Sequence, residues 1–294
     1  MRIQWEFFLL FCFYFNFVYL PASTQTIQLY AQFLSRTFKS VDSIRNYISG
    51  VKTFHAMLGF STDHIDSYMV NLSLKGIARL NPHAVKRAEP MTIAILFHLY
   101  DYLDFAIEDN VRYWCLFLFA FFLVARKSNL VPTSKDDICA GKFLQFKDIT
   151  VFEDYLLVKF RWSKTIQFGE RQIECPVIKL LDKRICPYSA FQNLLKLKNR
   201  NSLGAVFVTS DNKLITYSKF QRKLRSCLNG IGLDSNLFST HSFRRGFATL
   251  AFQYNVLPEH IQLLGDWKSD AYKCYLQLSW LDKLDILKSM FKDL

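Results

Sequence analysis

Apolar side chains recur every three or four positions through residues 1–80, the spacing at which side chains share one face of an α-helix. One helix is expected with Ser23 or Thr24 as its cap, a second over Ile44–Leu58 and a third over Thr62–Leu74. Gly59 follows the second helix, and glycine commonly ends helices because it adopts the left-handed conformation without strain. The pattern predicts an all-helical N-terminal domain over residues 1–80.

The pattern changes beyond residue 90, where short strand-like runs appear between helices. Apolar helical spacing covers Met91–Phe105 and Arg112–Ala125, and helices resume at Pro187–Lys198 and Ser218–Leu228 and continue to the end. Between these helix pairs, strands are expected at Ile149–Phe152, Tyr155–Phe160 and Arg171–Val177. Residues 91–294 are therefore predicted to form a mixed α/β domain with a small antiparallel sheet.

Residues 81–90 carry two prolines and no periodicity, which predicts a linker between the two domains. A cluster of basic residues surrounds it. The cluster fits a solvated hinge or a basic strap across a DNA backbone, and its charge alone leaves both interpretations open. Its members are Lys75, Arg79, Lys86 and Arg87.

Two long apolar runs, Phe7–Leu20 and Trp114–Ala125, are shorter than the ~20 residues that span a bilayer. The first resembles the apolar region of a signal peptide, but Glu6 precedes it and Asn16 interrupts it. We expect a buried helix ended by Pro21, and a central core helix for the second run. A secreted or membrane-tethered protein remains the alternative for the first run.

The composition of the chain narrows the class of molecule that it is expected to bind. The 294 residues are 51% apolar and 21% charged, which excludes a disordered chain, and 37 Lys plus Arg against 25 Asp plus Glu give a net charge of +12. This balance favours a polyanion such as nucleic acid. The seven cysteines never form a C-x-x-C pair and the histidines lack H-x-x-x-H spacing, so no disulfide framework or metal site is expected.

The stretch THSFRRGFATLAF, Thr240 to Phe252, combines a helix start with basic side chains. Ser239 or Thr240 can cap the helix, and His241 and Arg244 share a side of its first turn. A helix N-terminus offers free N–H groups and a positive dipole, so the turn suits an anion such as a phosphodiester. Alone, His-x-x-Arg is no more than an ordinary surface turn.

Three further elements accompany this turn. Arg126 ends the second apolar run in ARKSNLVP, and Lys164 lies in the bend of a predicted hairpin in RWSKTIQFGERQIECPV. A short helix opened by Pro258 and closed by Gly265 precedes GDWKSDAYKCYL, which places Tyr275 near the start of another helix.

In this order and spacing, Arg126, Lys164, the His-x-x-Arg turn and the late Tyr275 resemble the catalytic domain of tyrosine recombinases, the phage-integrase family. The motif sequences are most similar to the eukaryotic branch carried by crypton- and DIRS-type mobile elements. These sequences are RKSNLVP, WSKTIQ, HSFRRGFAT and GDWKSDAYKCYL. The resemblance covers residues 90–278, and residues 1–80 are similar to the family's helical, SAM-like core-binding domain.

The resemblance implies a role for each residue. Tyr275 would attack the scissile phosphate to form a 3′-phosphotyrosyl bond, while Arg126 and Arg244 bind its non-bridging oxygens. Lys164 would donate a proton to the 5′-hydroxyl leaving group, and His241 would assist as a base. Guanidinium groups suit this task because they offer bidentate hydrogen bonds to phosphate.

The sequence departs from the family pattern at two positions. Asp266 stands nine places before Tyr275, where the family usually has His or Trp, and an ionised carboxylate cannot donate a hydrogen bond to phosphate. Either Trp267 takes that role or the site is weakened. Asn129 stands where many relatives carry Glu, and Tyr272, one turn before Tyr275, is the rival nucleophile.

The resemblance further implies DNA recombination or integration on double-stranded DNA by a homotetramer in the nucleus, with no cofactor or metal. Expected DNA contacts are Lys75, Arg79, Lys86, Arg87 and Arg245. The last helix, Trp280–Leu294, would dock on a neighbouring subunit or on its own domain. The alternative is a domesticated or decayed recombinase that only binds DNA.

Overall fold

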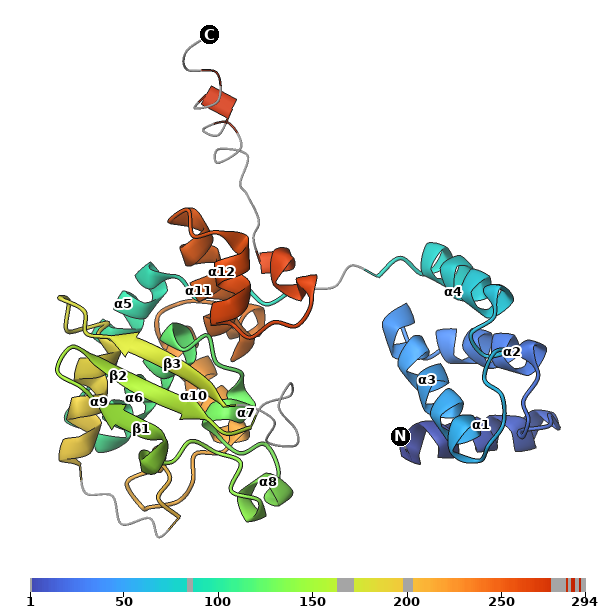
Figure 1. The fold of residues 1–294 in the computed structure, drawn as a ribbon, viewed down its shortest axis with the longest axis horizontal. Helices are drawn as coiled ribbons and strands as arrows, with labels where there is room; N and C mark the ends of the chain where they lie inside the picture. Colours follow the sequence, from blue (N-terminus) through green and yellow to red (C-terminus); the bar gives the residue numbers. More distant parts are fainter. Residues whose placement is uncertain are drawn as a thin grey trace. The chain divides into compact units, whose positions relative to one another are not determined.

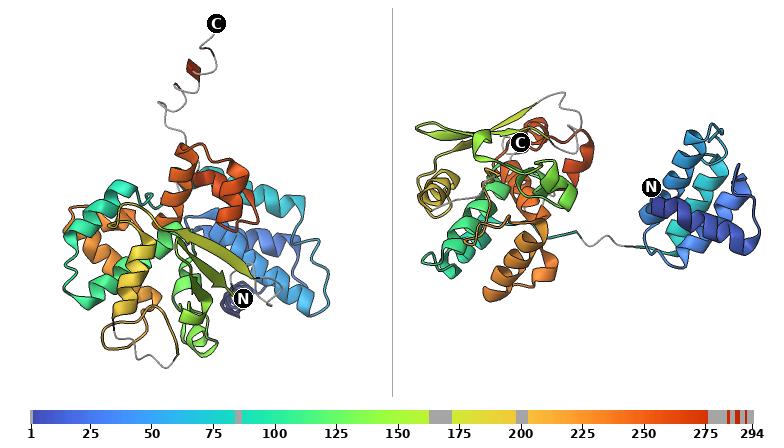
Figure 2. Two further views of the ribbon diagram at one scale, coloured as in Figure 1. Left: turned by 60° about the vertical axis from the view of Figure 1, so that its left-hand side comes forward. Right: turned by 90° about the horizontal axis from the view of Figure 1, so that it is seen from below.

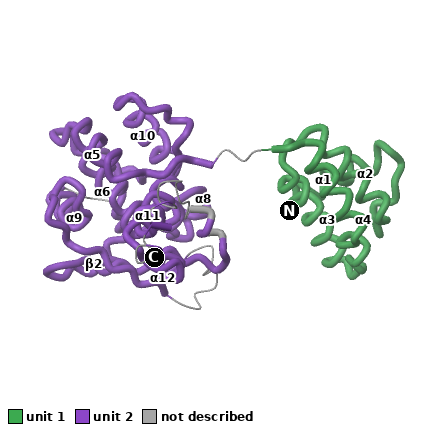
Figure 3. Tube along the Cα trace, turned by 90° about the horizontal axis from the view of Figure 1, so that it is seen from above, with its two compact units in different colours: residues 1–86 green, residues 87–294 purple. Residues whose placement is uncertain are grey.

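The computed structural model describes residues 2–83, 87–162, 172–197 and 203–275, together with Leu284, Leu287, Lys288 and Phe291. The chain divides into two compact units, Met1–Lys86 and Arg87–Leu294 (Figure 3). The division falls inside the stretch 81–90, whose residues 84–86 lie outside the described part.

Unit 1 consists of helices in the part described, as its apolar periodicity predicts. Its core includes Phe8, Ile27, Tyr30 and Leu34, each fully buried. Aromatic rings fill much of this core, for example the edge-to-face pair Phe8 and Tyr30 with ring centroids 5.0 Å apart. The helices are α1 (Arg2–Phe15), α2 (Thr24–Ser35), α3 (Val41–Met57) and α4 (Tyr68–Leu80).

The helix expected over Phe7–Leu20 ends earlier than predicted and is buried on one face only. Helix α1 ends at Phe15, before Pro21, because Asn16 adopts a left-handed φ of 56° and Phe17 N–H donates to the Cys12 carbonyl at 2.9 Å. The helix is only half-buried, since Tyr14 is 83% exposed. Among the described residues, no helix has both the length and the hydropathy needed to cross a lipid bilayer.

The third predicted helix, Thr62–Leu74, is wrong in its bounds. Helix α4 begins after Ser67, whose hydroxyl accepts the Val70 N–H at 3.4 Å, and it continues to Leu80. The preceding residues form a local turn in which Ser61 Oγ accepts the Asp63 N–H at 3.3 Å. The cap predicted at Gly59 is confirmed, with φ of 80° and Phe60 N–H donating to His55 O at 3.0 Å.

Unit 2 is a mixed α/β domain with a three-stranded antiparallel sheet in the order β1-β2-β3, which confirms the predicted fold class (Figure 1). The strands are β1 (Ile149–Val151), β2 (Tyr155–Phe160) and β3 (Ile173–Ile178). The α-helices are α5 (Ile93–Tyr102), α6 (Glu108–Phe122), α7 (Lys127–Leu130), α8 (Lys135–Cys139), α9 (Pro187–Lys196), α10 (Tyr217–Gly230), α11 (His241–Gln253) and α12 (Pro258–Leu264). Short 3₁₀ helices are η1 (Phe146–Asp148), η2 (Ser235–Leu237) and η3 (Asp270–Tyr275).

Helix α6 is the centre of the unit 2 core, as expected for the second apolar run. Every residue from Tyr113 to Phe121 is buried, and Phe119 stacks on Phe191 of α9 with centroids 5.7 Å apart. The alternate residues Leu156, Val158 and Phe160 of β2 turn their side chains to the same core. Figure 2 shows the sheet as a layer on one side of these helices. The end of α6 is thereby fixed just before Arg126.

Candidate active site

The start of α11 is held by a compact set of hydrogen bonds. Ser239 Oγ accepts the His241 N–H at 3.2 Å, and Ser242 Oγ accepts the Ser239 N–H at 3.0 Å. Thr240 N–H donates to Gln221 Oε1 of α10 at 3.1 Å. Of the two expected caps, Ser239 therefore supplies the side-chain oxygen. These bonds fix the first turn of α11, where the predicted His-x-x-Arg pair lies.

Arg244 is buried, with 2% of its surface exposed, although the sequence suggests a side away from the apolar stripe. Its guanidinium donates to the backbone carbonyls of Val124 and Gly265. The Trp267 ring lies 3.9 Å from its Cζ, a cation–π contact. These carbonyl oxygens and the ring face orient the Arg244 guanidinium at the turn that follows α12.

The backbone at Val124 has a left-handed φ of 48°, which is unusual for a β-branched residue. Such a conformation costs about 1–3 kcal/mol and persists only where the surroundings enforce it. Here it follows the end of α6 and directs the Val124 carbonyl to Arg244. The strained turn thus links the core helix to the arginine.

Arg126 directly precedes α7 and is partly buried, with a side chain 19% exposed. Its backbone N–H donates to Asn129 Oδ1 at 3.1 Å, and Asn129 Nδ2 donates to the Trp162 carbonyl at 2.8 Å. Arg126 Nη2 donates to the Asp266 carbonyl at 3.0 Å, while Arg126 Nη1 lies 3.6 Å from Asp266 Oδ2. Asn129 thus supports the backbone of the arginine.

The turn Gly265–Asp266–Trp267 joins the two arginines. Helix α12 ends with Gly265 as its C-cap, as predicted, and Asp266 follows with a left-handed φ of 48° while Trp267 N–H donates to the Gln262 carbonyl at 3.1 Å. Gly265 has another role, since a Cβ there would lie 1.7 Å from the Trp267 ring. Because consecutive Cα atoms are ~3.8 Å apart, carbonyls of adjacent residues hold Arg244 and Arg126 close together.

His241 lies at the surface, at the first position of α11. Partial withdrawal from water lowers its pKa below the ordinary 6.5, and the positive charges of Arg244, Lys127 and Arg126 lower it further. The neutral imidazole is therefore favoured at pH 7, which is the form that accepts a proton. The same three charges place His241 in the electrostatic field of both arginines.

The two tyrosines differ in their surroundings. Tyr272 is 2% exposed and packs with Ala248 and Ile261, so it is a core residue. Tyr275 is the last residue of the 3₁₀ helix η3, where the sequence predicts the start of a helix, and its side chain lies outside the described residues. Lys164 also lies outside the described residues.

The expected DNA contacts divide between the units. Lys75 and Arg79 are exposed on α4 of unit 1, while Lys86 lies outside the described residues. In unit 2, Arg245 Nη1 donates to the Ala88 carbonyl at 2.6 Å, close in sequence to Arg87. Arg245 therefore binds the protein's own backbone in this structure.

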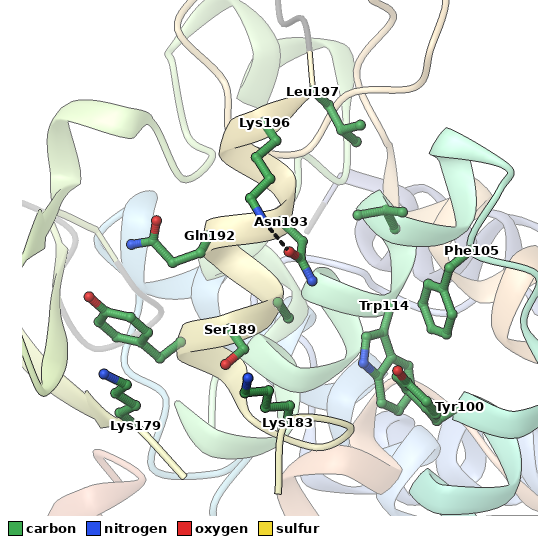
Figure 4. Close-up of a pocket in the computed structure, with 13 residues that line it drawn as sticks. Tyr100, Phe105, Trp114, Lys179, Lys183, Ser189, Gln192, Asn193, Lys196 and Leu197 are labelled. Carbon is green, nitrogen blue, oxygen red and sulfur yellow. Dashed lines mark hydrogen bonds between the residues drawn. The ribbon is translucent and has the colours of Figure 1, made fainter. Parts of the chain in front are cut away.

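A cavity of about 630 Å³ lies beside the middle of α6, more than two turns before the helix end that leads to Arg126. Tyr100, Phe105 and Trp114 line one side of it and α9 the other, as Figure 4 shows. It is separate from the arginine cluster. The candidate site is thus defined by side-chain chemistry and not by this cavity.

Sequence reasoning missed several residues that build the site. The left-handed φ of Val124, the ring contact of Trp267 with Arg244, and the packing of Gly265 are not visible as motifs. Lys127, whose Nζ lies 3.5 Å from the Tyr217 ring centroid, also belongs to the site through its effect on His241. The sequence Gly265-Asp266-Trp267 offers one signal, a glycine two residues before a large ring.

Known proteins provide an independent comparison. No family model matches the chain. An integrase/recombinase xerD homolog of Selenomonas ruminantium is 25% identical over 262 residues, covering 86% of this chain and 72% of that protein.

Two solved integrases share the fold. The Tn1549 transposon integrase (residues 82–397) in complex with circular intermediate DNA aligns with a TM-score of 0.57 at 12% identity, covering 90% of this chain and 85% of that one. A lambda integrase (75–356) dimer bound to a COC′ core site aligns with a TM-score of 0.56 at 15% identity, covering 87% and 80%. The chain is thus similar in sequence to an integrase/recombinase xerD homolog and shares its fold with two solved integrases.

Proposed function

We propose that the protein cleaves and rejoins DNA strands through a 3′-phosphotyrosyl intermediate. The observation that carries the proposal is the pair of guanidiniums, Arg126 and Arg244, held by the carbonyls of adjacent residues in a single turn. Two such groups suit the two non-bridging oxygens of one phosphodiester and the additional negative charge that develops there in the transition state. Positioned donors of this kind contribute about 10²–10³ each to a rate.

The reaction follows from the residue types. The Tyr275 phenolic oxygen attacks phosphorus and the bond to the 5′-oxygen breaks. The phenolic proton passes to His241, whose lowered pKa keeps it neutral, and Lys164 protonates the 5′-oxygen. In rejoining, a 5′-hydroxyl attacks phosphorus and releases the tyrosine. Each step forms one phosphoester bond as it breaks another, so no energy source is required.

Tyr275 is proposed as the nucleophile in preference to Tyr272. The burial of Tyr272 against Ala248 and Ile261 supports this choice, since a phenol packed in a core cannot reach a DNA backbone without local unfolding. Tyr275 lies nine positions after Asp266, the spacing that the family resemblance assigns to the nucleophile.

We further propose that the substrate belongs to a mobile element of crypton or DIRS type, that the protein acts in the nucleus, and that it works as a homotetramer on paired sites. These assignments rest on the resemblance of the motif sequences to that branch of the family. The basic residues Lys75, Arg79, Lys86 and Arg87 would bind DNA phosphates, which makes affinity fall steeply with salt.

A second candidate function is DNA binding without cleavage. The ion pair between Asp266 and Arg126 favours it, because it adds negative charge where the phosphate would bind. The two functions are separated by incubating the protein with a nicked duplex that carries DNA bordering the gene. A covalent protein–DNA adduct on a denaturing gel supports the enzyme, and salt-sensitive binding without an adduct supports the binding module.

Matched tyrosine variants make this test specific. The adduct should disappear in Tyr275→Phe and persist in Tyr272→Phe. Both variants keep the aromatic ring, so folding is conserved and only the hydroxyl is lost. An adduct that survives Tyr275→Phe would refute the assignment of the nucleophile.

A further inference from the structure

Asp266 contacts Arg126 in two distinct ways. Its backbone carbonyl accepts from Arg126 Nη2 at 3.0 Å, and its carboxylate Oδ2 lies 3.6 Å from Nη1. Both side chains are largely removed from water, at 13% and 19% exposure. A partly buried pair of this kind is screened less by salt than a surface pair.

The backbone of the turn does not require the carboxylate. Asp266 ends α12 in the left-handed conformation, which glycine and asparagine adopt as readily as aspartate. The carbonyl that orients Arg126 belongs to the main chain and would stay in place with either residue. The negative charge is therefore a feature separate from the turn.

The carboxylate adds a full charge to what the backbone supplies. Arg126 meets both the carbonyl and the carboxylate of Asp266. A full negative charge at this distance offsets much of the attraction of a guanidinium for an incoming anion.

We infer that the Asp266 carboxylate is a resident counter-ion of Arg126 that competes with phosphate for this guanidinium. The inference rests on the proposed function for the identity of the anion. When a phosphate enters, the carboxylate must leave Nη1, or it faces the phosphate as a like charge. The Asp266 carboxylate thus lowers affinity for the phosphate through its contact with Arg126.

The test measures binding of inorganic phosphate to the full chain by isothermal titration calorimetry at constant ionic strength. Asp266→Asn and Asp266→Gly each remove the charge and suit the left-handed turn. Both should lower the phosphate Kd by about tenfold. Asp270→Asn is the matched control, because Asp270 is exposed near this turn and pairs with Lys273 at 2.9 Å, so its loss should leave the Kd within about twofold.

Arg126→Gln should weaken phosphate binding, which locates the probe at this guanidinium. An unchanged or higher Kd in folded Asp266→Asn and Asp266→Gly would overturn the inference, as would phosphate binding that Arg126→Gln leaves intact. Unfolding of both Asp266 variants would also overturn it, because the carboxylate would then be needed for the turn. A tenfold gain in phosphate affinity without any Tyr275 adduct would support the inference and refute the enzyme.

Discussion

Gly246 of α11 makes room for the segment that leads into unit 2. A Cβ on Gly246 would lie 1.8 Å from the Met91 carbonyl oxygen and 2.7 Å from its carbon, far inside van der Waals contact. Met91 N–H donates to the Ser242 carbonyl at 2.9 Å, and Arg245 donates to the Ala88 carbonyl at 2.6 Å. Gly246→Ala must therefore push the backbone of residues 88–91 away from α11.

The expected cost follows from these contacts. Overpacking against rigid backbone costs about 1–3 kcal/mol, and the two hydrogen bonds that the shift strains contribute about 1 kcal/mol each. The better helix propensity of alanine offsets about 1 kcal/mol. We expect Gly246→Ala to destabilise unit 2 by about 2–3 kcal/mol, which lowers its melting temperature by roughly 4–10 °C.

Scanning calorimetry measures the effect, with tryptophan fluorescence identifying the transition of unit 2, which holds four of the five tryptophans. Gly76 of α4 provides the matched control, because a Cβ there meets nothing within 4 Å. Gly76→Ala should stabilise unit 1 by about 0.5–1 kcal/mol through propensity alone. A Gly246→Ala protein as stable as the parent would refute the close packing of Met91 on α11.

Three other predictions concern charge and ring contacts. The buried His55 accepts the Ala22 N–H at its Nε2, and burial lowers its pKa below 6.5, so the unfolded chain binds more protons below that pH. Urea unfolding of unit 1 should become easier as pH falls from 6.5 towards the lowered pKa, by at most about 1.4 kcal/mol per pH unit, and His55→Gln should remove this slope. Trp267→Leu should weaken the contact with Arg244 and cost unit 2 about 0.5–2 kcal/mol, whereas Trp267→Phe retains most of it; equal melting temperatures for the two variants would contradict the cation–π contact. The rate of adduct formation should fall as pH drops through the lowered pKa of His241, so its half-maximal value should lie below pH 6.5; a half-maximal rate above pH 6.5 would contradict its role as a neutral base.

The elements best predicted from sequence are those whose burial follows a strict period. Strand β2, Tyr155–Phe160, has the predicted bounds because alternate residues are buried. Helix bounds were less predictable. Helix α1 ends just before Asn16, which adopts the left-handed conformation, and α4 begins later than predicted because Ser61 and Asp63 form a turn. Asparagine, serine and aspartate also occur inside helices, so the sequence alone does not reveal these ends.

The candidate site shows a similar limit. Motif spacing identified Arg126, His241 and Arg244, but not how they are held, because the supporting atoms are backbone carbonyls that any residue could supply. The strained Val124 and the space above Gly265 depend on how α6 and α12 pack in three dimensions. The sequence shows that Asp266 departs from the family pattern, but its pairing with Arg126 is visible only in the structure.

The most direct measurement is to identify the amino acid that carries DNA after reaction with a nicked duplex. The adduct is digested with nuclease and trypsin, and tandem mass spectrometry locates the residual nucleotide on the peptide. Our account predicts a phosphodiester on the phenolic oxygen of Tyr275. A nucleotide on Tyr272 or on any other residue, or an adduct that forms equally well after Arg126 and Arg244 are both replaced by alanine, would contradict it.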